Sequence, residues 1–399
     1  MTSAVDLSLP HLGRCLRIEQ AFDVVDALIH ALPGWPITVQ PALGPMPDRY
    51  IYRDTKGLWQ GSFLEPNEFH LPSPASAACS LVGDLVSQRL LNQPELLGLH
   101  CASVEINGRL VVFPESSKAG KSTLAVAFSA AGYRIFGDDV LGLTAQGEGV
   151  AMGAAPRLRL PFPESFSPEF VAYADRHTGP EDDRYRFVIP ADNGLANYNE
   201  TCPVGAIVLL ERDSSISEPE VITLPPAEGL LQLLCQNFAS DSSSEVLLAR
   251  LVPLMAKIPC VLLRYSEPLA GARYLAQLIK AQQLPNAHHA SLLSMPSANG
   301  QPNIVSLRLN DQWQPHPAVT DYSLGDELFL IHTNNGVIHR LNSSGKIAWL
   351  LLQQQPLSVL ILSELLAQHF FMPLDSLSGD VTQLVTALAQ AKLIVPCSG

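Results

Sequence analysis

The segment that decides the fold is LHCASVEINGRLVVFPESSKAGKSTLAVAFSAAGYRIFGDDVLGL, residues 99–143. It opens with a predicted β-hairpin, because Asn107–Gly108 lies between alternating apolar runs and supplies the positive φ values that a tight turn needs. The second strand, residues 109–113, leads into a loop and then into a helical pattern. This order of strand, loop and helix predicts an α/β unit built around a phosphate-binding loop, or P-loop.

The loop ends in Gly120–Lys121–Ser122–Thr123. A glycine lets the backbone wrap around phosphate oxygens, and the N-terminus of the following helix adds a positive potential. We expect Lys121 to reach the β- and γ-phosphates of ATP and the Ser122 hydroxyl to ligate Mg²⁺. The pattern G-x-x-x-x-G-K-[ST] is incomplete, because Glu115 occupies the position of its first glycine. The predicted nucleotide-binding residues are Ser117, Lys118, Ala119, Gly120, Lys121, Ser122 and Thr123.

Two adjacent carboxylates, Asp138 and Asp139, follow the next predicted strand, residues 133–136. One interpretation is a turn with a local side-chain cap. The other is that one carboxylate ligates Mg²⁺ and the second accepts the proton of an attacking hydroxyl, as phosphoryl transfer requires. Because a P-loop pattern stands upstream, we favour the functional interpretation.

The order of these features resembles the HPr kinase/phosphorylase family, in which a His, a strand pair, a P-loop, a helix ending in Gly and an Asp–Asp pair follow one another. The matching features here are His100, the hairpin through Phe113, Gly120–Ser122, Gly132 and Asp138–Asp139. The resemblance is close over residues 99–143 and looser over the region around them. It implies a mixed α/β sheet with helices, of the kind shared by HPr kinase and PEP carboxykinase.

The resemblance also implies roles for individual residues. Lys121 binds phosphates, Asp138 is the catalytic base, and Ser122 with Asp139 forms the metal site. His100 matches the catalytic-site His that stands beside the base. Taken alone, a His near the start of a buried strand is more often simply a satisfied residue of the core.

One part of the family pattern is missing. No Glu–Ile–Arg–Gly stretch follows the Asp pair, and PRLRLPFPESF, residues 156–166, takes its approximate place. Arg157 or Arg159 could neutralise the transferring phosphate there, or could simply be surface arginines. The missing stretch leaves phosphorylase activity, and HPr itself as a substrate, unsupported.

The C-terminal region resembles the PqqD family of small winged-helix peptide chaperones. GDELFLI and VIHRLNSSGKIAWLL carry the likeness, with Leu341–Asn342 and Ile347–Ala348–Trp349 at its centre. The resemblance implies that a leader peptide adds as a strand along residues 337–341, backed by the last helix. The alternative for the leucines of that helix is a purely structural place in the core. The peptide-binding residues implied are Val337, Ile338, His339, Leu341, Leu384 and Leu388.

Segments rich in Pro, Gly, Ser and Asn, which are typical of loops, divide the chain of 399 residues into successive regions. We expect an N-terminal α+β region of unknown role, a P-loop domain of the α/β class, a linker and a winged-helix PqqD-like domain. Their expected bounds are residues 1–95, 96–285, 286–315 and 316–399.

The composition excludes several function classes. A formal net charge of −13 argues against a nucleic-acid partner and against an anionic membrane surface. Seven scattered cysteines, none in a CxxC spacing, favour a reducing compartment over a disulfide framework or structural zinc. The N-terminus lacks a signal-peptide pattern, and no apolar stretch is long enough to span a membrane. We therefore expect a cytoplasmic protein, with homo-oligomerisation left open.

These patterns lead to one main hypothesis of function and two alternatives. The main hypothesis is a kinase that uses ATP and Mg²⁺ to phosphorylate a Ser or Thr hydroxyl of a peptide or small protein in a ribosomal-peptide modification pathway. The first alternative, favoured by Glu115, is a non-catalytic peptide chaperone that senses nucleotide. The second is a kinase of a small metabolite, with the C-terminal region as a regulatory surface.

Overall fold

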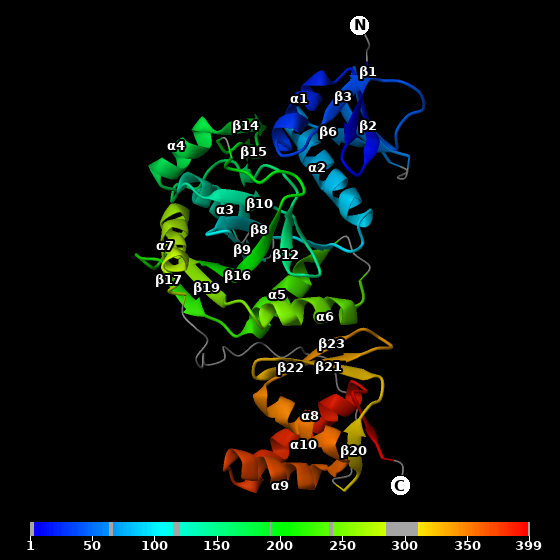
Figure 1. Ribbon diagram of the computed structural model, residues 1–399, viewed down its shortest axis with the longest axis vertical. Coiled ribbons are helices and arrows are strands. Elements are labelled where there is room, and N and C mark those ends of the chain that lie inside the picture. The colour runs from blue at the N-terminus through cyan, green and yellow to red at the C-terminus, as the bar shows by residue number, and fades with distance from the viewer. Residues whose placement is uncertain are drawn as a thin grey trace. The chain divides into compact units, whose positions relative to one another are not determined.

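The computed structural model describes residues 4–63, 67–114, 120–191, 193–238, 242–284 and 310–397. Their contacts divide the chain into two compact units. The first unit takes its described residues from 1–224, 231–240 and 258–288, and the second from 225–230, 241–257 and 289–399. The predicted mixed α/β class is confirmed, with helices and mixed sheets throughout (Figure 1).

The first unit begins with a sheet in the order β3-β1-β2-β4-β5-β6. The strands are β1 (Ala4–Leu9), β2 (Gly13–Glu19), β3 (Thr38–Pro41), β4 (Arg49–Asp54), β5 (Gly57–Ser62) and β6 (Phe69–Leu71). Two helices, α1 (Phe22–Ala31) and α2 (Pro74–Leu91), share an apolar core with it. Val150 and Met152 belong to the same core, so this N-terminal sheet is packed against the strands that follow it in the chain.

A second sheet of the first unit carries the P-loop region. Its strands are β7 (Leu97–Leu99), β8 (Ala102–Ile106), β9 (Arg109–Phe113), β10 (Arg134–Gly137), β11 (Leu141–Leu143), β12 (Glu148–Ala151), β16 (Thr201–Arg212), β17 (Glu220–Thr223), β18 (Asn237–Phe238) and β19 (Cys260–Tyr265). The predicted hairpin joins β8 to β9, with φ of 53° at Asn107 and 70° at Gly108. The long strand β16 runs parallel to both β9 and β19.

Helices α3 (Lys121–Ala130) and α7 (Pro268–Lys280) cover this sheet. Leu124 and Phe128 of α3 and Leu275 of α7 are fully buried in one apolar cluster with the strands. After α3, Gly132 adopts the left-handed φ of 87° that ends the helix. Beside α3 lies a small sheet with α4; its members are β13 (Arg157–Arg159), α4 (Pro168–Arg176), β14 (Thr178–Glu181) and β15 (Tyr185–Val188).

The second unit holds the C-terminal region together with α6 (Ser244–Met255) and the first turn of α5 (Pro226–Gln236). One sheet has the order β21-β22-β23 and another the order β24-β20-β25. The elements are β20 (Gln312–Pro315), β21 (Val319–Leu324), β22 (Glu327–His332), β23 (Ile338–Leu341), α8 (Ser343–Gln354), β24 (Leu357–Ser358), α9 (Val359–Phe370), α10 (Leu374–Gln390) and β25 (Ile394–Pro396). Trp349 of α8 lies at the centre of the core at 1% exposure.

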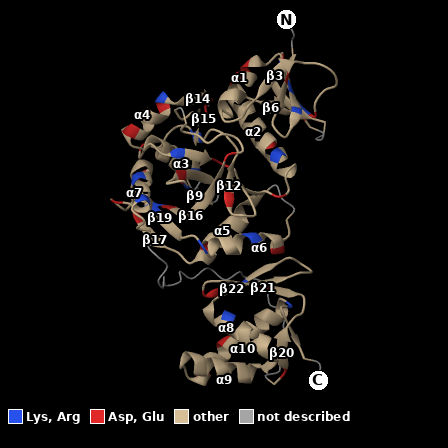
Figure 2. Ribbon diagram, viewed as in Figure 1, with Lys and Arg blue, Asp and Glu red and all other residues tan. Residues whose placement is uncertain are grey.

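Three further features bear on the sequence-based expectations. The expected linker, residues 286–315, lies mostly outside the described residues, but its last residues form β20, which pairs with β24 and β25. Charged residues of both signs are scattered over the elements rather than gathered on one of them (Figure 2). Among the described helices, none has the length and apolar character needed to cross a membrane.

Candidate active site

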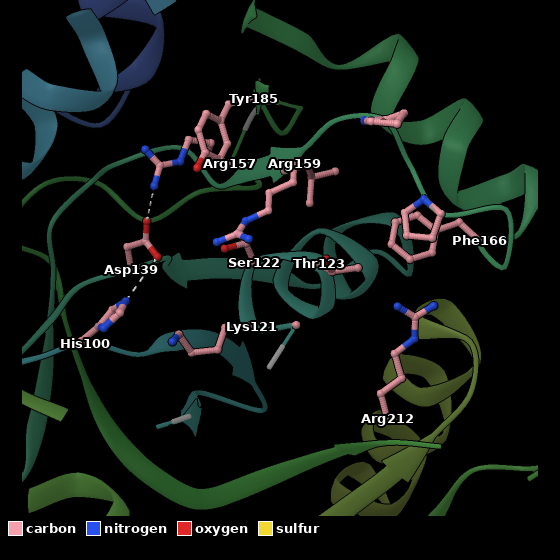
Figure 3. Close-up of a pocket in the computed structure, with 14 residues that line it drawn as sticks. His100, Lys121, Ser122, Thr123, Asp139, Arg157, Arg159, Phe166, Tyr185 and Arg212 are labelled. Carbon is pink, nitrogen blue, oxygen red and sulfur yellow. Dashed lines mark hydrogen bonds and ion pairs between the residues drawn. The ribbon is translucent and has the colours of Figure 1, made fainter. Parts of the chain in front are cut away.

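The candidate site lies at the carboxyl ends of three parallel strands. In open α/β sheets, ligands bind outside this edge. The chain leaves β9 toward α3, Arg212 is the last residue of β16, and its partner Tyr265 is the last residue of β19. A pocket of about 450 Å³ opens there (Figure 3). It is lined by His100, Gly120, Lys121, Ser122, Thr123, Asp139, Arg157, Leu158, Arg159, Pro161, Pro163, Phe166, Tyr185 and Arg212.

The N-terminus of α3 forms one wall of the pocket. Gly120 is the N-cap, with a φ of 98°, and a Cβ there would lie 2.8 Å from the Tyr265 hydroxyl. Glycine is therefore required by both backbone conformation and space. Lys121 is the first helical residue and is 6% exposed, and Ser122 and Thr123 follow it along the wall. A helix N-terminus with a lysine is a ready anion-binding site.

The first part of the predicted loop is not among the described residues. Ser117, Lys118, Ala119 and the unusual Glu115 lie outside the described residues. Their assignment to nucleotide binding stays a prediction.

The two aspartates of the pair stand in different environments. Asp138 is 4% exposed, and its Oδ2 accepts a hydrogen bond from the Arg157 backbone N–H at 3.2 Å. Its Oδ1 has no hydrogen-bond partner within the part of the chain that the structure describes. Burial, and then the neighbouring charge of Asp139, raise the pKa of Asp138 to about 7. A carboxylate with such a pKa is suited to accept a proton near neutral pH.

Asp139 is half-exposed and lies near His100 and Arg157. Its Oδ1 lies 3.6 Å from His100 Nε2, and its Oδ2 lies 3.3 Å from a terminal guanidinium nitrogen of Arg157 (Figure 3). Burial acts to raise the pKa of Asp139, but the neighbouring His100 and the charge of Arg157 outweigh it and lower the pKa. Asp139 is therefore ionised near neutral pH, whereas Asp138 gains and loses its proton in that range.

The two arginines proposed from the sequence both lie on β13 and line the pocket. Arg157 also stacks over the Tyr185 ring, 4.8 Å from its centroid. The structure thus brings His100, Lys121, Asp139 and both arginines around one cavity, although β13 lies far from the P-loop in sequence.

The donor set fits Mg²⁺ that arrives with a nucleotide. Among the described residues, no three His, Cys, Asp or Glu side chains gather as a metal cluster. Mg²⁺ is commonly held by one or two carboxylates while phosphate oxygens and water complete its shell. The unpartnered Asp138 Oδ1, the Ser122 hydroxyl and the ionised Asp139 are oxygen groups of this kind near the helix N-terminus.

The expected peptide-binding residues lie in the second unit. β23 is the end strand of its sheet, and the described strands offer it β22 as its partner. Val337 is 48% exposed just before β23, Ile338 and His339 are half-buried, and Leu341 is buried. Arg340 of the same strand forms ion pairs with Glu327 and Glu228, both within this unit.

The two leucines of α10 differ. Leu384 is half-buried, whereas Leu388 is 3% exposed and packs inside the apolar core of the second unit. The structure therefore places Leu388 where the structural alternative expects it.

Residues 327–394 match the family model of coenzyme PQQ synthesis protein D (PqqD). This PqqD domain confirms the resemblance of the C-terminal region. It comprises the strands β22, β23 and β24 and the helices α8, α9 and α10.

Two solved structures are similar to parts of the chain. TbiB1 in complex with the TbiA(beta) leader peptide is 20% identical, with 22% of this chain and 99% of that chain covered at a TM-score of 0.20. The HPr(Ser) kinase/phosphatase from Coxiella burnetii is 16% identical, with 47% of this chain and 96% of that chain covered at a TM-score of 0.26. No curated protein matches the chain in sequence.

Sequence reasoning missed six of the residues that line the pocket, which are Leu158, Pro161, Pro163, Phe166, Tyr185 and Arg212. Arg212 could have been found, because it ends the apolar run GAIVLLER that forms a buried parallel strand. Phe166 and Tyr185 belong to the segment around the small β13-β15-β14 sheet, which has no sequence pattern that indicates a ligand site.

Proposed function

We propose that the protein is a kinase that transfers the γ-phosphate of ATP, with Mg²⁺, to a Ser or Thr hydroxyl of a peptide or small protein recruited by the PqqD domain. The observation that supports it most is that Lys121, at a helix N-terminus, and Asp139 line the same pocket, with the buried Asp138 beside it. Such transfer is achieved mainly by positioning and by stabilisation of charge.

In this mechanism the backbone at the start of α3 and Lys121 bind the phosphates. Arg157 and Arg159 neutralise the charge that develops on the phosphoryl oxygens. Ser122 and Asp139 would hold Mg²⁺, which supplies further positive charge to the phosphates when bound. The acceptor oxygen attacks the γ-phosphorus, the bond from that phosphorus to the bridging oxygen of ADP breaks, and Asp138 takes the hydroxyl proton.

His100 has a positioning role in this proposal. Its Nε2 faces Asp139 rather than the acceptor, so it helps to keep that carboxylate ionised and oriented. The side chain of His100 is half-exposed, which differs from the place in the core that the sequence alone suggested.

The PqqD domain would supply the substrate. An extended peptide can add to an open sheet edge, where main-chain hydrogen bonds give affinity and side-chain pockets give specificity. The end strand β23 is such an edge among the described strands, and Ile338, His339 and the half-buried Leu384 are the side chains that would meet the peptide.

The test uses a short peptide encoded beside this gene, incubated with the full chain, ATP and Mg²⁺ and weighed by mass spectrometry. The proposal expects the mass of one added phosphoryl group with the wild-type chain and none with Lys121→Ala. An unchanged peptide and no consumption of ATP would instead support a nucleotide-sensing peptide chaperone. Phosphorylation of a small metabolite with no effect of the peptide would support the second alternative.

A further inference from the structure

We propose that Arg212 and Phe166 form a platform on which the base of the bound nucleoside triphosphate stacks. The inference rests on the proposed function and adds to it the place of the nucleoside. It concerns residues that neither the P-loop pattern nor the Asp pair indicates.

The pocket has two chemically different ends. Figure 3 shows His100 and Asp139 on one side of Ser122 and Thr123, and Phe166 and Arg212 on the other. The first end carries the groups that act on a phosphate. The second end carries the aromatic ring of Phe166 and the guanidinium of Arg212.

The direction of the nucleotide follows from these ends. The γ-phosphate must face the aspartates, because the acceptor proton is taken there. The preceding phosphates then pass the start of α3, where Ser122 and Thr123 line the wall. The nucleoside is consequently directed toward the end that carries Phe166 and Arg212.

The side chains of Arg212 and Phe166 at that end are held in place by several contacts. The guanidinium carbon of Arg212 lies 5.4 Å from the Phe166 ring centroid, and one terminal nitrogen donates a hydrogen bond to Ser165 Oγ at 2.6 Å. The Phe166 ring in turn contacts the fully buried Phe170 edge-on, with centroids 4.8 Å apart. Arg212 itself is exposed at the end of β16 and makes no ion pair with the described carboxylates.

A planar guanidinium that lies over an aromatic ring leaves its outer face for a base to stack on, and Arg212 is exposed. A base offers the flat π-face, and the arginine adds a cation–π contribution. The competing role for Arg212 is neutralisation of a phosphate, which would affect the binding of any polyphosphate, with or without a base.

The experiment separates these roles by comparing ATP with inorganic tripolyphosphate, which has the phosphates but no base. Equilibrium binding of each ligand is measured with Mg²⁺ on the full chain and on Arg212→Ala, Arg212→Lys and Phe166→Leu. Arg184→Ala is the matched control, since that exposed arginine stacks on Tyr185 at 5.6 Å without lining the pocket. Thermal unfolding verifies that each variant is folded.

We expect all three platform variants to weaken ATP binding about tenfold while tripolyphosphate binding stays unchanged. Arg212→Lys is the decisive variant, because it keeps the charge and loses the planar surface. Equal loss for both ligands in Arg212→Ala, with rescue by Arg212→Lys, would overturn the proposal in favour of phosphate binding, and unchanged ATP binding in all variants would also overturn it. A wild-type chain that binds neither ligand would overturn the nucleotide site itself.

Discussion

Two sheet edges of this molecule, one in each unit, differ in the charge of the side chains around them. The carboxyl edge of β9, β16 and β19 is surrounded by charged side chains, several of them buried or half-buried. The edge of β23 carries Ile338 and His339, and its one cation, Arg340, is neutralised by Glu327 and Glu228. The first edge is suited to a compact anion through side-chain charge, and the second to an extended chain through its backbone.

Ligand binding at the two edges should therefore be sensitive to different substitutions. Binding by charge depends on a few side chains, each of which has a large effect. Binding by backbone depends on N–H and C=O groups, so that most side-chain changes have small effects.

The largest effect is expected at Lys121. Lys121→Ala removes the positive charge at the N-terminus of α3, and we expect phosphate transfer to fall about 100- to 1000-fold. Initial rates of transfer measure the effect, with Lys280→Ala at the exposed end of α7 as the control. Near-normal turnover in Lys121→Ala would show that the first edge does not act through its charge.

The buried charge of Asp138 should make stability depend on pH. Its pKa is about 7 in the folded chain and 3.8 ordinarily, so the folded state binds the proton more tightly and wild-type stability falls as pH rises between these values. Asp138→Asn lacks this loss. Its gain in the free energy of unfolding should therefore be larger at pH 8 than at pH 5, by roughly 2 kcal/mol.

Urea unfolding of the metal-free protein at both pH values measures this difference. The matched control is Asp182→Asn, because the pKa of Asp182 is lowered, so that this carboxylate is ionised at both pH values, and it accepts hydrogen bonds from Ser73 and Ser76. Equal gains for Asp138→Asn at the two pH values would mean that Asp138 carries no such raised pKa.

At the second edge, proline substitutions should distinguish the residue whose N–H points outward from the residue whose N–H points toward β22. Successive residues of a strand point their N–H groups to opposite sides, so either Ile338 or His339 donates outward and the other donates toward β22. Of Ile338→Pro and His339→Pro, one should weaken peptide binding about tenfold with little change in unfolding temperature, and the other should destabilise the domain. ATP binding should be unchanged in both. If both variants bind the peptide normally, β23 is not the docking edge.

The smallest effect is expected at Leu384. Because it is half-buried, Leu384→Ala should lower peptide affinity about fivefold and leave ATP binding unaltered. Fluorescence anisotropy of a labelled peptide gives the affinity. Leu388→Ala, in the core, should act on stability instead. A purely structural role for both leucines would appear as lower unfolding temperatures with the same peptide affinity.

The sequence predicts the parts of this molecule that depend on neighbouring residues. The hairpin at Asn107–Gly108, the glycine before α3 and the end of that helix at Gly132 all follow from local backbone preference. The PqqD domain is predicted as well, by a resemblance that its family model confirms.

The parts that the sequence could not predict depend on pairings between distant residues. Local periodicity says nothing of which strand ends meet, so Arg212 and Phe166 were not associated with the P-loop. For the same reason β20 was expected to be linker, since its order comes from pairing with β25 at the far end of the chain. The different burial of Asp138 and Asp139 is likewise set by the tertiary packing around them.

In the proposed mechanism, Lys121 and the two aspartates act on the same phosphate in one pocket. A crystal structure of the full chain with Mg²⁺ and a non-hydrolysable ATP analogue tests this arrangement most directly. We expect the terminal phosphate to lie within hydrogen-bond distance of Lys121 Nζ, with Mg²⁺ between that phosphate and the oxygens of Ser122 and Asp139. A nucleotide bound elsewhere, or a pocket closed by side chains in the presence of saturating analogue, would contradict it.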